Sequence, residues 1–466
     1  MATIRKKLGA ALVGLAVLSL SLSACGGGGG ADDVGGGGAD GEAIDTSNAS
    51  GDISYWLWDA GQLPAYQACA DAFHTANPNI NVKISQYSWD DYWGKITNGF
   101  VAGDAPDVFT DHLSKYGEFV NQDQLVPLDA TLAKDGFDVN QYQPGLADLW
   151  VGENGKRYGL PKDFDTNAIF YNRDLVNAGG YSASDLANLS WNPTDGGSYE
   201  KVIAHLTVDQ NGMRGDEAGF DKSKIKVYGL GLDGGSGGSG AGQTQWSMYT
   251  GSNDFTYTDK NPWGTKYNYD SPKFQETIAW YKTLIDKGYM PSVAQVTGQD
   301  ESSIFTAGKY AMVTNGSWNT NALAGNKDVA VGLAPTPVGP TGKRASMYNG
   351  LADFIWVGSK NKPAAAKWVE FLGSPDCQNI VGEKSVVFPA IPSATEKAQG
   401  AFKSKGIDVS PFLDQVTDKT TFLFPITDHA SEITNILTPA LDNVLSGKAE
   451  VSSLTEANNQ INQLFQ

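Results

Sequence analysis

The sequence has few cysteines, few histidines and no long basic tract. Its 466 residues include three cysteines and four histidines, and 34 Lys and Arg stand against 52 Asp and Glu. Three cysteines cannot form the disulfide framework of a small secreted domain. The histidines are scattered and show no metal-ligand spacing such as H-E-x-x-H, which argues against a metal enzyme. A formal net charge of −18 without a basic tract argues against a nucleic-acid partner.

Length and composition indicate a folded protein with more than one core. A chain of 466 residues exceeds one ordinary domain, and its 41% hydrophobic and 11% aromatic residues can fill two cores. We therefore expect two lobes. The acidic balance is typical of a soluble exported protein.

The first fifty residues carry targeting information. Arg5, Lys6 and Lys7 precede an uncharged apolar run at residues 8–22, which predicts a signal peptide over residues 1–24. Leu-Ser-Ala-Cys at residues 22–25 resembles a bacterial lipobox, which implies cleavage before Cys25 and attachment of lipid to its sulfur. Gly-rich residues 25–50 predict a flexible tether. We expect a lipid-anchored protein on the extracellular face of the cell membrane.

Two cysteines remain after Cys25. Cys69 and Cys377 can pair in an oxidising compartment, provided that their Cα atoms lie within about 7 Å. The sequence leaves both the paired and the free state open.

Strands and helices alternate after residue 50. Aromatic and β-branched residues predict strands at 52–58, 80–84 and 106–109, and apolar stripes predict helices that begin near Pro64 and include Tyr92. This α/β alternation implies a parallel or mixed sheet with helices packed on it. Ligands of such sheets bind at the carboxyl ends of the strands. These ends carry the candidate ligand residues Trp58, Asp59, Trp89, Asp111 and His112.

A glycine motif in the second half does not indicate a nucleotide site. Residues 229–234 match the dinucleotide pattern G-x-G-x-x-G, but the Gly-Ser run at 235–240 cannot begin the helix that would bind a pyrophosphate. We predict a strand that leads into a pliable loop, and no cofactor.

Three segments together resemble a known family. Residues 161–175 read P-K-D-F-D-T-N-A-I-F-Y-N-R-D-L, residues 308–318 read G-K-Y-A-M-V-T-N-G-S-W, and residues 103–107 read G-D-A-P-D. They resemble extracellular solute-binding proteins of the maltose-binding-protein type (family 1). The resemblance spans the chain after Ser50.

The resemblance implies a two-lobe periplasmic-binding-protein-like fold. Each lobe would be a mixed sheet flanked by helices, and a multi-strand hinge would join the two, with crossings in 161–175, 347–353 and 388–390. The implied first lobe is 51–163 plus 352–388, and the second is 164–351 plus 389–466.

Carbohydrate offers hydroxyls at its edge and C–H groups on its faces, which suit carboxylates or amides and flat aromatic rings respectively. Loop positions and the resemblance together give the candidate ligand-binding residues Trp58, Asp59, Trp89, Asp111, His112, Asp165, Gln243, Trp246, Trp263, Trp318, Asn349, Gly350, Asp353 and His429. Tryptophans within helix or strand stripes, such as Trp280 and Trp368, are expected in the core.

The resemblance implies a monomeric binding component of an ABC transporter rather than an enzyme. It would capture an oligosaccharide and pass it to the permease subunits. Two other functions stay open from the residues alone. An exported glycoside hydrolase needs only two suitably spaced carboxylates, and the same fold would serve a binder of a peptide or a polyamine.

Overall fold

The computed structural model describes residues 41–234 and 241–466. The predicted signal peptide 1–24, the lipidation site Cys25, residues 25–40 of the tether and the Gly-Ser run at 235–240 lie outside the described residues. Within the described part of the chain, no helix is both long and apolar enough to cross a membrane.

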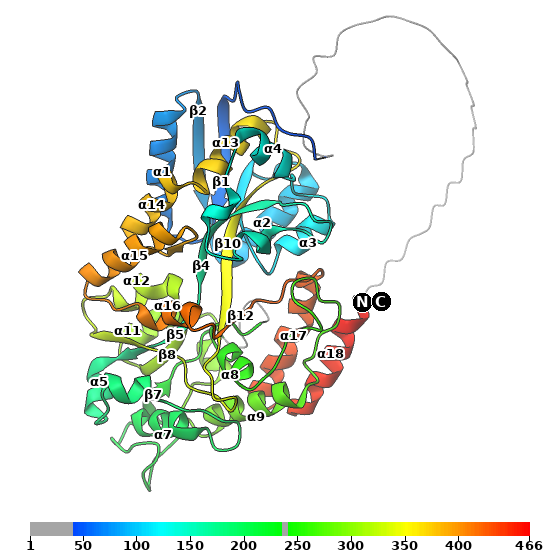
Figure 1. Ribbon diagram of the computed structural model, residues 1–466. Helices are drawn as coiled ribbons and strands as arrows, with labels where there is room; N and C mark the ends of the chain where they lie inside the picture. The colour runs from blue at the N-terminus through cyan, green and yellow to red at the C-terminus, as the bar shows by residue number, and fades with distance from the viewer. Residues whose placement is uncertain (1–40, 235–240) are drawn as a thin grey trace, which may run out of the picture. The chain divides into compact units, whose positions relative to one another are not determined.

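The described residues contain two mixed β-sheets with helices packed around them (Figure 1). The first sheet has the order β11-β4-β10-β3-β1-β2, with β12 paired to β10. Its strands are β1 (Gly51–Leu57), β2 (Ile80–Gln86), β3 (Val108–His112), β4 (Gly159–Asp165), β10 (Ser346–Ile355), β11 (Phe388–Pro389) and β12 (Thr421–Leu423). β1 pairs in parallel with β2 and β3, whereas β10 runs antiparallel to β3 and β4.

The second sheet has the order β6-β7-β8-β5-β9. Its strands are β5 (Asn167–Asn172), β6 (Val208–Asp209), β7 (Ile225–Leu230), β8 (Tyr310–Gly316) and β9 (Val331–Ala334). Only the β7–β8 pair is parallel. β5 and β8 are buried along their whole length, as expected of central strands covered on both faces.

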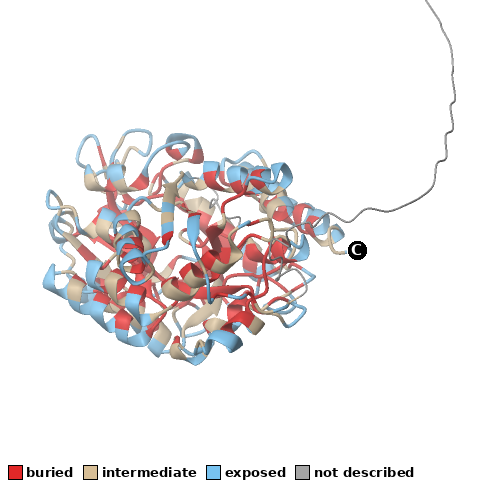
Figure 2. Cartoon of the chain, turned by 90° about the horizontal axis from the view of Figure 1, so that it is seen from above, coloured by how far each residue is buried: buried red, intermediate tan, exposed pale blue. Residues whose placement is uncertain are grey.

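Helices cover the faces of both sheets. Figure 2 shows buried residues gathered in the interior and exposed residues on the outer helix surfaces. The α-helices are α1 (Leu63–Ala76), α2 (Trp89–Ala102), α3 (Tyr116–Asn121), α4 (Asp129–Asp135), α5 (Arg173–Ala178), α6 (Ala183–Ala187), α7 (Gly197–Leu206), α8 (Ser247–Ser252), α9 (Pro272–Asp286), α10 (Val293–Val296), α11 (Glu301–Thr306), α12 (Thr320–Ala324), α13 (Lys362–Leu372), α14 (Pro375–Lys384), α15 (Pro392–Ser404), α16 (Ser410–Thr417), α17 (Ala430–Leu445) and α18 (Leu454–Gln463). The 3₁₀ helices are Val139–Gln141, Ala147–Trp150, Ser317–Asn319 and Val451–Ser453.

The apolar stripes read from the sequence face the core. In α1, Tyr66, Cys69, Ala70 and Phe73 are all buried, and proline stands in the first turn as its lack of an N–H permits. The N-cap of α5 is Asn172, whose side-chain oxygen accepts hydrogen bonds from the Asp174 and Leu175 N–H groups.

The chain passes from one sheet to the other at the strands that lie side by side in the middle of Figure 1. β4 of the first sheet ends at Asp165 and β5 of the second begins at Asn167, so a single residue separates them. β10 returns to the first sheet beside β4. Both strands run past the lobe boundaries predicted after residues 163 and 351, and the division into lobes at those residues remains a prediction.

The end of the predicted tether is packed rather than free. Ile44 is buried, and its N–H donates to the Thr131 hydroxyl of α4, while the Thr46 hydroxyl donates to Asp135. One apolar side chain and two polar anchors therefore bind this stretch to the folded body, which composition alone does not reveal.

A disulfide joins α1 to α14. The Cys69 and Cys377 sulfurs are bonded, and their Cα atoms lie 5.1 Å apart. Of the two states that the sequence left open, the structure has the paired one. The bond closes a sequence separation of 308 residues.

Candidate functional site

A cleft of about 790 Å³ lies between residues of the two sheets. It forms where β1, β3 and β4 of the first sheet and β7 and β8 of the second reach their carboxyl ends, as expected for α/β sheets. The lining residues are Trp58, Asp59, Ala60, Gln62, Trp89, Asp90, His112, Asp163, Phe164, Asp165, Asp233, Gly234, Gln243, Thr244, Gly298, Asp300, Trp318, Asn319, Asn349, Leu351 and Val387.

Aromatic rings line the cleft from both sheets. Trp58 follows β1 and Trp89 begins α2, and their ring centroids lie 5.0 Å apart in an edge-to-face arrangement. The ring of His112, at the end of β3, lies 5.5 Å from that of Trp89. Trp318 follows β8 in the second sheet and lines the same cleft. Its ring packs over Gly316, where any β-carbon would collide with it, so the Gly-x-Trp spacing has a steric cause.

Amide groups link the two sheets at the end of β4. The carboxylate of Asp165 accepts a hydrogen bond from Gln243 Nε2 at 2.7 Å and one from Asn349 Nδ2 at 3.2 Å. Asn349 Nδ2 also lies 2.7 Å from His112 Nε2. Burial holds His112 neutral by lowering its pKa to about 3. Four predicted ligand residues therefore form one connected polar group beneath the cleft.

Asp163 lies two residues earlier on β4 and faces the same space. Its Oδ1 accepts a hydrogen bond from the Leu351 N–H at 3.1 Å, while its buried Oδ2 has no hydrogen-bond partner. Burial raises the pKa of Asp163 to about 7, although Lys162 opposes that rise. Oδ2 of Asp163 is therefore available to accept a hydrogen bond from a ligand.

Trp246 is a core residue rather than a cleft residue. It is fully buried, and its ring packs 5.2 Å from Phe274 and 6.0 Å from Tyr257. The aromatic residues that follow it in sequence form a cluster which encloses it, so its place just after the glycine loop does not lead into the cleft.

Asp353 is likewise internal. Its Oδ1 accepts hydrogen bonds from the Tyr55 and Thr110 hydroxyls at 2.8 Å and lies 3.8 Å from Lys162 Nζ. Asp353 sits in the part of β10 that pairs with β3, away from the strand ends. Its carboxylate balances the charge of the buried Lys162 and does not line the cleft.

Four further candidates lie outside the cleft lining. Asp111 is fully buried and accepts from the His112 N–H, and the small Gly350 lies against β4 without reaching the cleft surface. The ring of Trp263 packs 5.7 Å from that of Tyr116, and its backbone N–H donates to the Ile426 carbonyl. His429 is the N-cap residue of α17, and its ring lies 5.3 Å from that of Phe465.

Several lining residues were not singled out from the sequence. Gln62, Asp163, Asp233, Asp300 and Asn319 enter the cleft. Asp233 lies three residues after the end of β7, the strand that we predicted to lead into a loop, and Asp163 lies in the crossing segment, so strand-end position was an available signal for both. Asp300 caps α11 through the Ser303 N–H, and nothing local marks it as a cleft residue.

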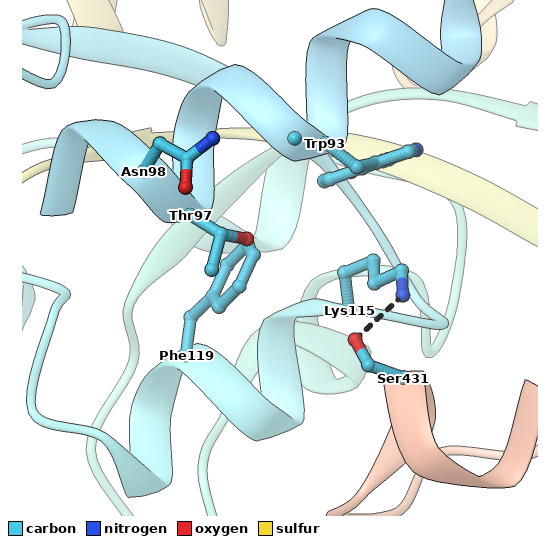
Figure 3. Close-up of a pocket in the computed structure, with 7 residues that line it drawn as sticks. Trp93, Thr97, Asn98, Lys115, Phe119 and Ser431 are labelled. Carbon is cyan, nitrogen blue, oxygen red and sulfur yellow. Dashed lines mark hydrogen bonds between the residues drawn. The ribbon is translucent and has the colours of Figure 1, made fainter. Parts of the chain in front are cut away.

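A smaller cavity of about 320 Å³ lies apart from the cleft, between α2, α3 and the start of α17 (Figure 3). Lys115 Nζ donates to the Ser431 hydroxyl at 3.0 Å, and Glu118 Oε2 accepts from the same hydroxyl at 2.9 Å. The rings of Trp93 and Phe119 form part of its wall. Lys115, Ser431 and Glu118 are thus hydrogen-bonded to one another, whereas the buried indole N–H of Trp93 has no partner within the described residues.

A family comparison identifies the class of this chain. Residues 68–406 match the family described as bacterial extracellular solute-binding protein, which is well over half of the 466 residues. The chain belongs to this family. The description names proteins that bind solutes, and the cleft between the two sheets has room for one.

Named relatives are similar along most of their length. A maltooligosaccharide ABC transporter solute-binding lipoprotein of Streptococcus pneumoniae serotype 4 is 26% identical over 84% of this chain and 82% of its own. A galactooligosaccharide-binding protein of Bacillus subtilis is 24% identical over 93% and 91%. The solved structure of the ABC substrate-binding protein Lmo0181 from Listeria monocytogenes, in complex with cycloalternan, covers 89% of this chain and 99% of its own with TM-score 0.75 and 19% identity, which establishes the shared fold.

Proposed function

We propose that this solute-binding protein captures an oligosaccharide in the cleft and delivers it unaltered to the permease of an ABC transporter. The observation that carries the proposal is the cleft itself, in which Trp58, Trp89 and Trp318 stand among carboxylates and amides contributed by both sheets. Flat rings bury the C–H faces of a sugar while the polar groups bond its hydroxyls. The named relatives, which bind maltooligosaccharide and galactooligosaccharide, support the same ligand class.

The two sheets would form the cores of two lobes that close on the ligand. A ligand that contacts both lobes favours the closed arrangement only through its higher affinity for that state. The short connection between β4 and β5 and the return through β10 would act as the hinge. The closed protein would act as a monomer, held at the membrane by lipid on Cys25, and would present the ligand to the permease.

Binding without turnover separates this proposal from a glycoside hydrolase. Incubation with an oligosaccharide panel should give a saturable heat of binding in calorimetry and no released product. The same ligands should raise the thermal midpoint, because a ligand bound only by the folded state stabilises it. Sustained product release would contradict the proposal.

Trp318→Ala tests the site at one residue. Loss of its ring face should weaken oligosaccharide affinity at least tenfold, or about 1.4 kcal/mol, without a change in the far-UV circular dichroism spectrum. Trp263→Ala is the matched control, because Trp263 lies outside the cleft lining. Equal affinities for wild type and Trp318→Ala would show that the site lies elsewhere.

A further inference from the structure

The cleft is lined by carboxylates without a matching cation. Six lining residues carry a carboxyl group, and no Lys or Arg among the described residues lines it. The six are Asp59, Asp90, Asp163, Asp165, Asp233 and Asp300. The one lining histidine, His112, is neutral because its burial disfavours the charged ring. Burial raises the pKa of Asp163, Asp165 and Asp233, so these three hold their protons more strongly than free carboxyl groups do. The ionised carboxylates of this concave wall give the enclosed space a negative potential.

Asp163 supplies an independent sign that a ligand group is expected there. Only 3% of Asp163 is exposed, yet its Oδ2 has no hydrogen-bond partner within the described residues. A buried polar atom without a partner is costly and needs an explanation. Since Asp163 lines the cleft, a bound ligand is the natural source of the missing donor.

The neighbouring lysine does not supply that donor. Lys162 Nζ donates to the Tyr55 and Thr110 hydroxyls at 2.8 Å and lies 3.7 Å from the centre of the Tyr66 ring. The hydrogen bonds of this ammonium group thus go to the two hydroxyls, and none joins Lys162 to Asp163 within the described residues. The other charged groups that act on Asp163 are the carboxylates Asp353 and Asp59, which add negative charge.

A protonated amine is the group that fits these conditions. It offers three donors and no acceptor, and its charge strengthens the bond to a carboxylate. A hydroxyl offers one donor and leaves the negative charge uncompensated, and an anionic group adds repulsion. We propose that the cleft selects saccharides that carry a protonated amine, with Asp163 as its partner, and disfavours saccharides that carry carboxylate or phosphate groups. This selectivity rests on the proposed function.

The test uses matched ligands and calorimetry at about pH 7. The panel contains neutral α- and β-linked oligosaccharides of glucose and N-acetylglucosamine, with the amino-deoxy or deacetylated form and the uronate form of each. We expect the amine form of the binding member to bind at least tenfold more tightly than its neutral form, and the uronate form at least tenfold more weakly.

Two further measurements tie the preference to Asp163. Asp163→Asn should abolish the difference in affinity between the amine and neutral forms, whereas Asp104→Asn, which removes an exposed carboxylate outside the lining, should preserve it. Independently of any variant, titrations in buffers of different ionisation enthalpy should show proton release when wild type binds the amine, because pairing lowers the pKa of Asp163 from about 7.

The possible failures are distinct. If neutral members bind and their amine forms bind no more tightly, the inferred selectivity is wrong and the proposed function stands. If no saccharide of the panel binds in any form, both are wrong.

Discussion

At the scale of the residue, Asp163 contributes to the pH dependence of stability. Asp163 is an acid whose pKa in the folded state is raised to about 7 from 3.8 by burial. The folded state therefore holds the Asp163 proton more tightly than the unfolded state does, and the contribution of Asp163 to the free energy of unfolding falls as pH rises between these two values. Lys162, which opposes the shift, limits its size.

Replacement of Asp163 should flatten this pH dependence. Asp163→Asn cannot ionise, so its free energy of unfolding should exceed that of wild type at about pH 8 by an amount on the order of 1–3 kcal/mol, with little difference at about pH 4. Urea denaturation followed by fluorescence at the two pH values measures this. A wild-type advantage at about pH 8 would show that the carboxylate is stabilised in the folded state.

Mutation of Trp246 tests whether this residue belongs to the core rather than to the cleft. Since it is fully buried in an aromatic cluster, Trp246→Ala should leave a cavity and lower the free energy of unfolding by about 3–5 kcal/mol. Urea denaturation measures the loss, and Trp318→Ala, from the cleft surface, should lose far less. Oligosaccharide affinity of the folded Trp246→Ala fraction should match wild type, and a selective loss of affinity with unchanged stability would return Trp246 to the site.

At the scale of the element, α17 depends on a side chain from another helix. His429 precedes it with φ 58° and no side-chain cap. Glu118 of α3 instead accepts hydrogen bonds from the Ser431 N–H at 3.2 Å and its hydroxyl at 2.9 Å. The negative charge of this acceptor also interacts favourably with the positive end of the helix dipole.

Removal of that acceptor should loosen the start of α17. Glu118→Ala should lower stability by about 1 kcal/mol and speed amide exchange in the first turn of α17. Hydrogen exchange read by mass spectrometry measures the effect at peptide resolution. Glu118→Gln, which keeps an acceptor oxygen, is the control and should lose less, and equal protection in wild type and Glu118→Ala would contradict the role of this contact.

At the scale of the whole molecule, one covalent bond links distant parts of the chain. The Cys69–Cys377 disulfide spans 308 residues of sequence and joins α1 to α14. A crosslink across so long a loop restricts the unfolded chain strongly, and its removal typically costs about 2–5 kcal/mol.

Reduction should therefore lower the thermal midpoint of the wild-type protein. The double variant Cys69→Ser with Cys377→Ser should melt at the lower temperature with or without reductant, which separates loss of the disulfide from other effects of the reagent. Scanning calorimetry with and without reductant measures both. Identical midpoints for oxidised and reduced wild type would contradict a stabilising role.

The sequence by itself determined the alternation of strands and helices and the faces that they bury, because periods of 2 and 3.6 residues and the Gly and Pro breaks are local properties. Strand ends are readable from the same patterns and predicted Trp58 and Trp89 as cleft residues. The crossing segment and Trp318 were predicted from the resemblance to a known family.

Only the tertiary structure decided which other side chains share the space. Trp246 and Asp353 stand at positions that resemble those of cleft residues, but neighbours distant in sequence enclose the first and a buried lysine takes up the second. Asp300 lines the cleft from the N-cap of α11, where no local pattern marks a ligand residue. Burial and contact depend on residues brought together by folding, and a single sequence carries no local sign of them.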